Sequence, residues 1–265
     1  MSAAPWDYIA KLVCIGDSGC GKSSLTIRLC EGRFVTHHDV TIGVEFGSRI
    51  VPVGPPHTSE AIPPLSPADD ATAAATTGGG LPEPRIIPTT APAEAQKHMK
   101  LSLWDTAGQE TYKSVTRSYF RGASGALLVF DLSRKQTFQH VTDWLNDLRQ
   151  IAEPDIVVVL VGNKADLAQP QSDSDENKRE VTREEAEEWA RRNGVLEYVE
   201  TSAKSGENVE KAFMRVAERI YQNIQAGKYD LNDRRSGVKG HNAGGPGRPV
   251  RLTNEKSKSV TAGCC

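Results

Sequence analysis

Short apolar runs alternate with amphipathic stretches in two parts of the chain, residues 1–51 and 98–226. The runs "KLVCI", "KLSLWD", "ALLVFDL" and "IVVVLVG" resemble β-strands, and two of them are apolar throughout, as strands buried on both faces are. Between them, apolar residues recur at steps of three and four, the spacing of one helix face. One series is Phe138, Val141, Leu145, Leu148 and Ile151, and another is Val209, Ala212, Phe213, Val216 and Ile220. The alternation predicts an α/β fold with a mostly parallel sheet covered on both faces.

Residues 52–97 break this pattern. They hold ten of the fifteen prolines and contain no Phe, Trp or Tyr, so they cannot bury enough apolar surface to offset the entropy of ordering. We expect a disordered insertion between "VEFGSRIV" and "HMKLSLWD", which can still pair as a hairpin because the cost of loop closure grows only logarithmically with length. The alternative is that the segment is absent from the functional protein, for example as an unremoved intron.

Composition excludes several classes of protein. The 265 residues carry a formal net charge of −2, which offers no strong attraction to nucleic acid. No apolar run approaches the ~20 residues of a membrane span, and the first ten residues lack the pattern of a secretory signal. The five cysteines form neither a disulfide framework nor a zinc pattern, which indicates a reducing, intracellular setting.

The stretch from residue 227 to 265 is again loop-like. It carries eight Lys or Arg against three Asp or Glu and ends with Cys264 and Cys265. A flexible positive tail with two terminal thiols suits lipid anchoring at an anionic membrane surface, where two lipid chains hold stably and one does not. The alternative is a solvated tail with free thiols.

The stretch "GDSGCGKS", residues 16–23, follows a strand-like run and precedes a helix-like one. It matches G-x-x-x-x-G-K-[ST], in which glycines let backbone N–H groups face phosphate oxygens and the next helix adds its positive dipole end. Lys22 is expected to reach the β- and γ-phosphates, and Ser23 to bind Mg²⁺. The alternative is a glycine-rich turn that binds nothing. The predicted phosphate-binding residues are Asp17, Ser18, Gly19, Cys20, Gly21, Lys22, Ser23 and Ser24.

Two further motifs indicate the base. "VGNKAD", residues 161–166, offers a carboxylate that can accept from both N1–H and the 2-amino group of guanine, donors that adenine lacks. "ETSAK", residues 200–204, offers a backbone N–H to the 6-oxo group. Either tetrapeptide alone could be a plain surface turn, but their order after successive strands favours guanine. The predicted base-binding residues are Asn163, Lys164, Asp166, Ser202, Ala203 and Lys204.

The stretch "LSLWDTAGQE", with "HHDVTIGVEF" upstream, has the features of a γ-phosphate sensor. Asp105 can hold Mg²⁺ through water, the Gly108 N–H can reach the γ-phosphate, and Gln109 can orient an attacking water. Thr41 is expected to be a second hydroxyl ligand for Mg²⁺, beside Ser23. Hydrolysis would release the segments of Thr41 and Gly108. The alternative for Gln109 is a residue that only faces solvent.

Together these motifs resemble the Ras-like small GTPases, and "TIGVEF", "WDTAGQE", "RSYFRGASGALLVFDLS" and the final "CC" resemble the Rab family. "IYQNIQAGKYDLN" and "RGASGALLVFD" are similar to its Golgi and early-endosome recycling members. The resemblance implies a P-loop small GTPase fold over residues 1–51 and 98–226, with a six-stranded, mostly parallel sheet flanked by five helices. Residues 52–97 would be a disordered insertion in the interswitch hairpin, and residues 227–265 a flexible basic tail.

The resemblance also implies roles and partners. The family's guanine-stacking aromatic falls on Phe34, and both terminal cysteines would be prenylated. The effector-binding residues would be Ile42, Gly43, Val44, Phe46, Trp104 and Tyr119, whose aromatic members could otherwise be ordinary packing. Partners would be a nucleotide exchange factor, a GTPase-activating protein, a GDP-dissociation inhibitor, an escort protein and vesicle effectors.

Such a protein cycles between the cytosol and the cytoplasmic face of Golgi or endosomal membranes and hydrolyses GTP slowly. Two other classes remain open. One is a scaffold that holds GTP without useful hydrolysis because the insertion blocks regulators; Gln109 argues against it. The other is a P-loop kinase or ATPase, against which "NKAD" argues.

Overall fold

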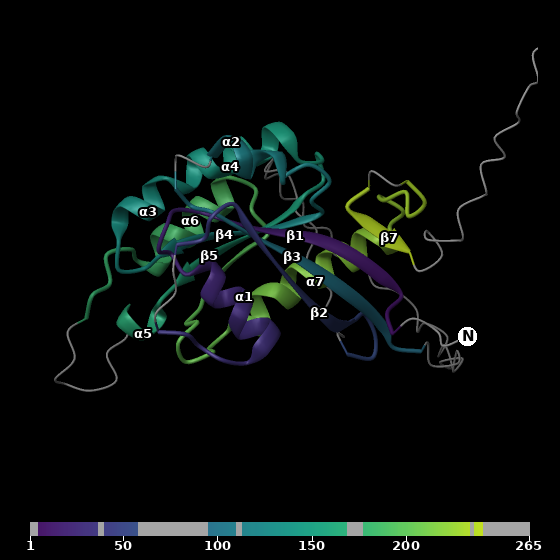
Figure 1. The fold of residues 1–265 in the computed structure, drawn as a ribbon, viewed down its shortest axis with the longest axis horizontal. Coiled ribbons are helices and arrows are strands. Elements are labelled where there is room, and N and C mark those ends of the chain that lie inside the picture. Colours follow the sequence, from purple (N-terminus) through teal and green to yellow (C-terminus); the bar gives the residue numbers. More distant parts are fainter. Residues whose placement is uncertain are drawn as a thin grey trace, which may run out of the picture.

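The computed structural model describes residues 5–36, 40–57, 95–109, 113–168, 177–233 and 236–240. These residues form one sheet with helices on both sides (Figure 1). The strands are β1 (Tyr8–Ile15), β2 (Val44–Val53), β3 (Lys97–Thr106), β4 (Gly125–Asp131), β5 (Val157–Asn163), β6 (Glu197–Glu200) and β7 (Val238–Gly240). The helices are α1 (Lys22–Glu31), α2 (Lys113–Ser118), α3 (Lys135–Gln139), α4 (Val141–Ile151), α5 (Ala165–Ala168), α6 (Arg183–Arg192) and α7 (Val209–Gln225).

The sheet has the order β2-β3-β1-β4-β5-β6. Strands β3, β1, β4, β5 and β6 are parallel, and β2 joins the edge as the antiparallel partner of β3. Every residue of β4 and β5 is buried, in agreement with the apolar runs that predicted them. The predicted six-stranded, mostly parallel sheet is therefore confirmed, with β7 as an additional short strand.

Two apolar layers cover the sheet. Helices α1 and α7 pack on one face, and α3, α4 and α6 pack on the other (Figure 1). The helical series that ends at Ile220 is buried along α7. The series that begins at Phe138 is divided between α3 and α4 by a break at His140, although Phe138 and Leu145 remain in one cluster. Among the described residues, the seven helical segments exceed the five expected because α3 and α5 are short additions.

Strands β2 and β3 pair as a hairpin along their full length, up to the segment that connects them. The pairing runs from Val44 opposite Thr106 to Val53 opposite Lys97, so the strands extend slightly into the predicted insertion. Gln96 closes the end of the hairpin by donating from Nε2 to the carbonyl oxygen of Val53 at 2.9 Å. Residues 58–94, the main part of the predicted insertion, lie outside the described residues.

The first part of the C-terminal stretch is not the free tail that its composition predicts. Strand β7 pairs antiparallel with Tyr8–Ala10 of β1, and Val238 is fully buried. This pairing is possible because β4 begins opposite Leu12 and leaves the start of β1 open on that side. An open strand edge presents unpaired backbone groups, which β7 satisfies. The prediction of a flexible tail from residue 227 is thus wrong for residues 236–240.

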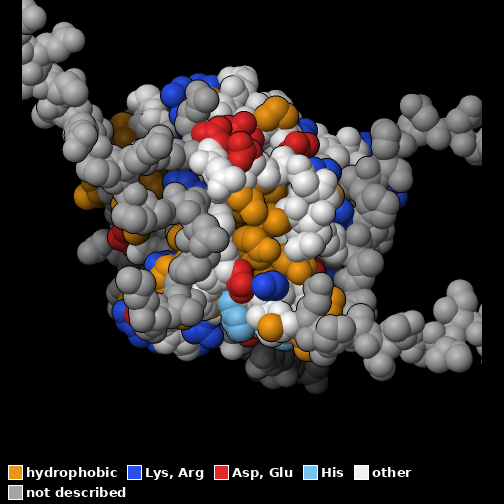
Figure 2. All heavy atoms as spheres, turned by 90° about the vertical axis from the view of Figure 1, so that its right-hand side faces the viewer, with side chains coloured by type: hydrophobic (Ala, Val, Ile, Leu, Met, Phe, Trp, Pro, Cys, Tyr) orange, Lys and Arg blue, Asp and Glu red, His pale blue; other side chains and the backbone are white. Residues whose placement is uncertain are grey.

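Figure 2 views the molecule from the end that carries β7 and the part of the β2–β3 hairpin next to the segment that connects its strands. Hydrophobic side chains gather in the middle of this face, with acidic side chains above them and a mixed charged group below (Figure 2). Helix α7 reaches this end, where the ring centre of its Tyr221 is 6.1 Å from that of Tyr8 in β1.

In the described part of the chain, no helix is both long enough and apolar enough to cross a membrane.

Candidate functional site

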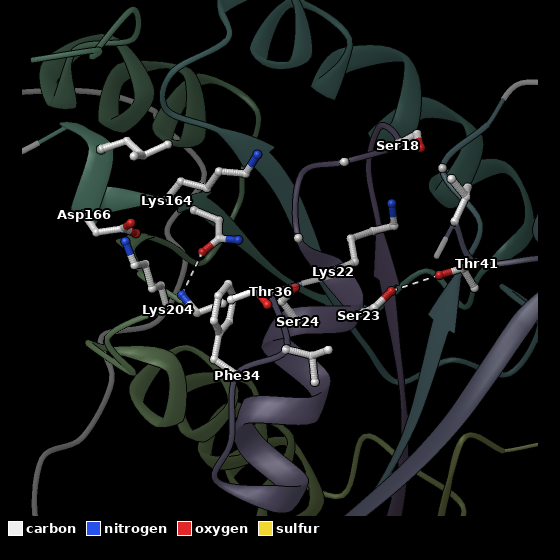
Figure 3. Close-up of a pocket in the computed structure, with 18 residues that line it drawn as sticks. Ser18, Lys22, Ser23, Ser24, Phe34, Thr36, Thr41, Lys164, Asp166 and Lys204 are labelled. Atoms are coloured by element: carbon white, nitrogen blue, oxygen red, sulfur yellow. Dashed lines mark hydrogen bonds between the residues drawn. The ribbon is translucent and has the colours of Figure 1, made fainter. Parts of the chain in front are cut away.

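A cavity of about 440 Å³ lies beyond the carboxyl ends of the parallel strands (Figure 3). Ligands of open α/β sheets bind at this edge because the loops that follow the strands converge there. The cavity is lined by the predicted residues Ser18, Gly19, Gly21, Lys22, Ser23, Ser24, Phe34, Thr41, Gly108, Asn163, Lys164, Asp166, Ala203 and Lys204. It is also lined by Val35, Thr36, Val40 and Leu167, which the motifs did not identify.

The phosphate loop connects β1 to α1 and is held from behind by Asn163. The Asn163 Nδ2 donates to the carbonyl oxygen of Cys20 at 2.8 Å, and both residues are buried. Gly21 caps the start of α1 with φ of +90°, and a Cβ there would lie 2.3 Å from the Asn163 Nδ2. Glycine at this position thus allows the loop to sit directly against the Asn163 amide.

Lys22 is buried in this loop. Its Nζ donates to the carbonyl oxygens of Gly16 at 2.8 Å and of Asp17 at 2.9 Å. Burial lowers the pKa of Lys22, because carbonyl dipoles compensate an ammonium less fully than water does. A phosphate oxygen in the cavity would add a negative charge close to this buried ammonium, which favours an anionic ligand.

The Asp17 side chain does not face the cavity. Its Oδ1 accepts from the indole N–H of Trp144 at 2.8 Å, and its Oδ2 lies 2.7 Å from the Nδ1 of His140. Asp17, predicted as a nucleotide-binding residue, is not among the residues that line this cavity, and its side chain attaches the loop to α4. The buried Cys20 likewise contributes no side chain to the cavity lining.

The base half of the cavity is held by hydrogen bonds within the protein. The Ser202 hydroxyl donates to Asp166 Oδ1 at 2.6 Å, which orients the carboxylate that would select guanine. The Ala203 N–H, expected to meet the 6-oxo group, donates to Asn163 Oδ1 at 3.2 Å. A base oxygen would have to share or replace this long hydrogen bond. Ser202 itself does not line the cavity and acts through Asp166.

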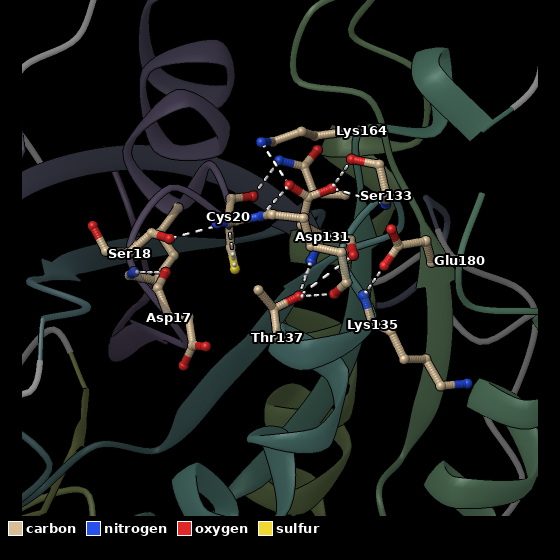
Figure 4. Close-up of polar contacts among 12 residues, drawn as sticks. Asp17, Ser18, Cys20, Asp131, Ser133, Lys135, Thr137, Lys164 and Glu180 are labelled. Atoms are coloured by element: carbon tan, nitrogen blue, oxygen red, sulfur yellow. Dashed lines mark hydrogen bonds and ion pairs between the residues drawn. The ribbon is translucent and has the colours of Figure 1, made fainter. Parts of the chain in front are cut away.

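Lys164 closes another side of the base half. Its backbone has φ of +67°, and its Nζ forms a 2.7 Å ion pair with the buried Asp131, as Figure 4 shows. Burial alone would raise the pKa of Asp131, but hydrogen bonds from Lys164 and Ser133 outweigh it and hold the pKa below its ordinary value. The ammonium is thereby anchored, which leaves the Lys164 stem to line the cavity.

The three predicted magnesium ligands lie together. The Ser23 hydroxyl donates to Asp105 Oδ2 and lies 2.9 Å from Thr41 Oγ1, which is in turn 3.5 Å from the same carboxylate oxygen. Two hydroxyls and one carboxylate are hard oxygen donors, and Mg²⁺ commonly uses few protein ligands together with substrate phosphates. Among the residues that the structure describes, no larger cluster of His, Cys, Asp or Glu could hold a metal ion. The donor set therefore fits Mg²⁺.

The segment after β3 reaches the phosphate loop. The Ser18 N–H donates to the carbonyl oxygen of Gly108 at 3.1 Å, so Gly108 lies against the loop. Gln109 lines a neighbouring cavity of about 370 Å³, which shares Ser18 and Gly108 with the first. Gln109 thus lines a cavity beside the phosphate loop.

The predicted effector-binding residues form an exposed surface beside Thr41. Ile42 and Phe46 are 78% and 65% exposed, and Phe46 packs edge-on against Trp104 with ring centres 4.4 Å apart. Tyr119 adds a third ring, 5.3 Å from that of Trp104. Gly43 and Val44 connect Thr41 to this aromatic cluster of Phe46, Trp104 and Tyr119. The two cysteines predicted to carry lipids, Cys264 and Cys265, lie outside the residues described.

Several residues that support the site were not identified from sequence. They are Arg28, Asp131, Arg134, His140, Trp144 and Thr201. All of them contact the site motifs from segments distant along the chain or through backbone atoms. Such contacts leave no local pattern, although Thr201 lies within the recognised "ETSAK" stretch.

A comparison with protein families gives an independent finding. The model of the Ras family matches residues 11–60 and 88–222, which together are more than half of the chain. The match includes the phosphate loop, β2, β3, the "NKAD" and "SAK" loops and most of α7.

Proposed function

The chain belongs to the Ras family and is a GTP-binding small GTPase switch; from this premise we propose that it works as a prenylated Rab-type regulator of vesicle traffic at Golgi or endosomal membranes. In the proposal, Asp166 selects guanine, the phosphate loop holds the phosphates, and Gln109 orients the attacking water. Bound Mg²⁺ would supply charge stabilisation between the phosphates, held by Ser23, Thr41 and Asp105.

The aromatic cluster beside Thr41 is the observation that carries this proposal. Thr41 and Ile42 are consecutive, so a change in the position of the Thr41 hydroxyl would also move the exposed residue next to it. An exposed apolar surface of this kind marks a protein-interaction site. Coupling between the γ-phosphate and such a surface is what a switch that recruits effectors requires.

The position of the β2–β3 insertion also supports a regulated switch over a passive scaffold. The insertion leaves the hairpin after Val53, seven residues beyond Phe46 on β2, which is roughly 23 Å at the rise of a strand. The strands between these two points keep their full pairing. The part of the hairpin that carries Phe46 therefore keeps the paired geometry that a regulator or effector would bind.

Membrane attachment is tested with the tagged full chain in cells. We expect the wild-type protein on Golgi or endosomal membranes and the Cys264→Ser/Cys265→Ser variant in the cytosol. A membrane-bound double variant would contradict the lipid anchor, and a wild-type protein found only in the cytosol would contradict the proposed location.

Effector binding is tested with Phe46→Ala. This variant should still bind nucleotide but lose the partners that bind the GTP-loaded form and not the GDP-loaded form. Ile50→Ala, at an exposed position on the same strand, is the matched control.

Single-turnover GTP hydrolysis with a Rab-specific activating protein separates the switch from a scaffold, because a scaffold predicts no acceleration of hydrolysis.

A further inference from the structure

Arg28 lies in the last turn of α1 and joins two separate segments of the chain. Its Nε donates to the carbonyl oxygen of Ala203 at 2.9 Å, and its Nη2 donates to that of Lys204. On the other side, its Nη1 donates to the carbonyl oxygen of Gly32 at 2.8 Å. One guanidinium therefore holds three backbone carbonyls, two of which are about 175 residues away in sequence.

The two segments both contribute residues to the wall of the base half of the cavity. Ala203 and Lys204 line it from one segment, and Phe34, two residues after Gly32, lines it from the other; Figure 3 shows Lys204 and Phe34 at the cavity. Arg28 itself is not among the lining residues. It lies behind the walls and can influence a bound base only through them.

We propose that Arg28 is a positioning residue for guanine recognition, which holds the loop of Ala203 and Lys204 against the segment that leads to Phe34. The proposal rests on the proposed role of this cavity in binding guanine. It adds a residue that no motif identifies and that couples base recognition to the helix following the phosphate loop.

A simple helix cap does not account for these contacts. Basic side chains near a helix C-terminus often bond to the last carbonyls, and the contact with Gly32 is of this kind. The bonds to Ala203 and Lys204 serve no helix end. They also require a planar fork with several fixed donors, which arginine has and lysine does not.

The test measures nucleotide dissociation from the full chain with Mg²⁺ present. Arg28→Ala should release GDP about tenfold faster, because charge-assisted hydrogen bonds to the loop are lost. Arg28→Lys should show a smaller increase in the same direction. Arg192→Ala, which removes an exposed arginine of α6, should leave the dissociation rate unchanged.

A second probe separates positioning from general destabilisation. The 6-thio analogue of GDP carries sulfur, a weaker acceptor, where the Ala203 N–H is expected to donate. The wild-type protein should release the analogue faster than GDP. In Arg28→Ala, the ratio of the two release rates, analogue over GDP, should fall close to one. General loosening would accelerate the release of both nucleotides equally and leave the ratio unchanged.

Unchanged GDP release in Arg28→Ala, or faster release with an unchanged ratio, would overturn the proposal. If Arg28→Ala does not fold, Arg28→Lys decides by the same two measurements. A wild-type protein that binds GDP no better than ADP would instead refute guanine recognition by the cavity. The two failures are thus distinguishable.

Discussion

The base half and the phosphate half of the cavity differ in how their polar groups are held. In the base half, the Asp166 carboxylate is oriented by Ser202, which lies beside the cavity and not in it. In the phosphate half, the groups expected to bind the ligand contact each other or their own loop. Ser23 and Thr41 are in mutual hydrogen-bond distance, and Lys22 bonds to carbonyls of the phosphate loop.

This difference separates the selection of the base from the response to the phosphates and Mg²⁺. A bound base can leave the Ser202–Asp166 hydrogen bond in place. The carboxylate that selects the base is therefore already oriented before the base binds. Bound Mg²⁺ would replace the mutual contacts of Ser23 and Thr41, so this half must rearrange with its ligand. We therefore expect changes in the two halves to have separable effects, one on base choice and the other on the affinity for every nucleotide.

The largest expected effect is that of Lys22→Ala. Removal of this buried ammonium leaves the phosphates without their main cation, and the affinity for GDP and GTP should fall by about 100-fold or more. Equilibrium binding of a fluorescent GDP measures this, with Lys211→Ala on the exposed face of α7 as control. An unchanged GDP affinity would show that the phosphate half does not depend on Lys22.

Asp166→Asn should change the base that the protein prefers. Xanthine has a 2-oxo group where guanine has its 2-amino group, and the amide introduced by this substitution can donate to that oxygen. Affinity for GDP should fall by about 100-fold, because its donors lose a charged acceptor, while affinity for xanthosine diphosphate should rise. Competition binding with both nucleotides measures the change in base preference, and Asp230→Asn at an exposed position is the control. Equal losses for both nucleotides would contradict base selection by Asp166.

Magnesium removal should affect only the phosphate half. Chelation with EDTA should accelerate GDP release from the wild-type protein by about tenfold or more, since Ser23 would hold Mg²⁺ and the metal would supply positive charge to the phosphates. Ser23→Ala should release GDP rapidly with or without EDTA. The preference for GDP over ADP should persist in both cases. A loss of that preference on chelation would show that the two halves are not separable.

The smallest expected effect concerns a support beneath the base half. Arg179 donates to both carboxylate oxygens of the buried Glu200, at 2.9 and 2.8 Å. Burial alone would raise the pKa of Glu200, but the hydrogen bonds from Arg179 outweigh it and lower that pKa below its ordinary range. A lowered pKa in the folded state stabilises the protein above the unfolded-state pKa, and this contribution is lost as the pH falls through the folded-state pKa.

Arg179→Ala should therefore lower the free energy of unfolding at pH 7 by about 1–3 kcal/mol. The difference from wild type should shrink as the pH falls below the ordinary pKa of a glutamate, about 4.3, and through the lowered folded-state pKa of Glu200. Urea unfolding of the GDP-loaded proteins at several pH values measures it, with Arg192→Ala as control. A difference that stays constant with pH would contradict the role of the Glu200 charge.

Local sequence patterns predicted the parts of this molecule whose chemistry depends on consecutive residues. The glycines and Lys22 of the phosphate loop, and the buried strands β4 and β5, have their signal within a few positions. The lining of one cavity by residues from "GDSGCGKS", "NKAD" and "SAK" also follows, because parallel strands end at the same edge of the sheet.

The features that sequence did not reveal depend on contacts between distant segments. Three residues around Lys239 show no alternation long enough to indicate a strand, and β7 forms because β1 has an open edge there. Arg28 resembles any surface arginine of a helix until the loop of Ala203 is folded against it. The side chain of Asp17 turns away from the cavity because Trp144, more than 120 residues later, offers it a donor.

The most direct test of the whole account is competition between GDP and ADP for the wild-type protein in the presence of Mg²⁺. Asp166 has paired donors to meet on guanine and none on adenine, so GDP should displace a bound fluorescent guanine nucleotide at concentrations at least about 1,000-fold lower than ADP. Displacement by the two nucleotides at similar concentrations would contradict base selection by this cavity.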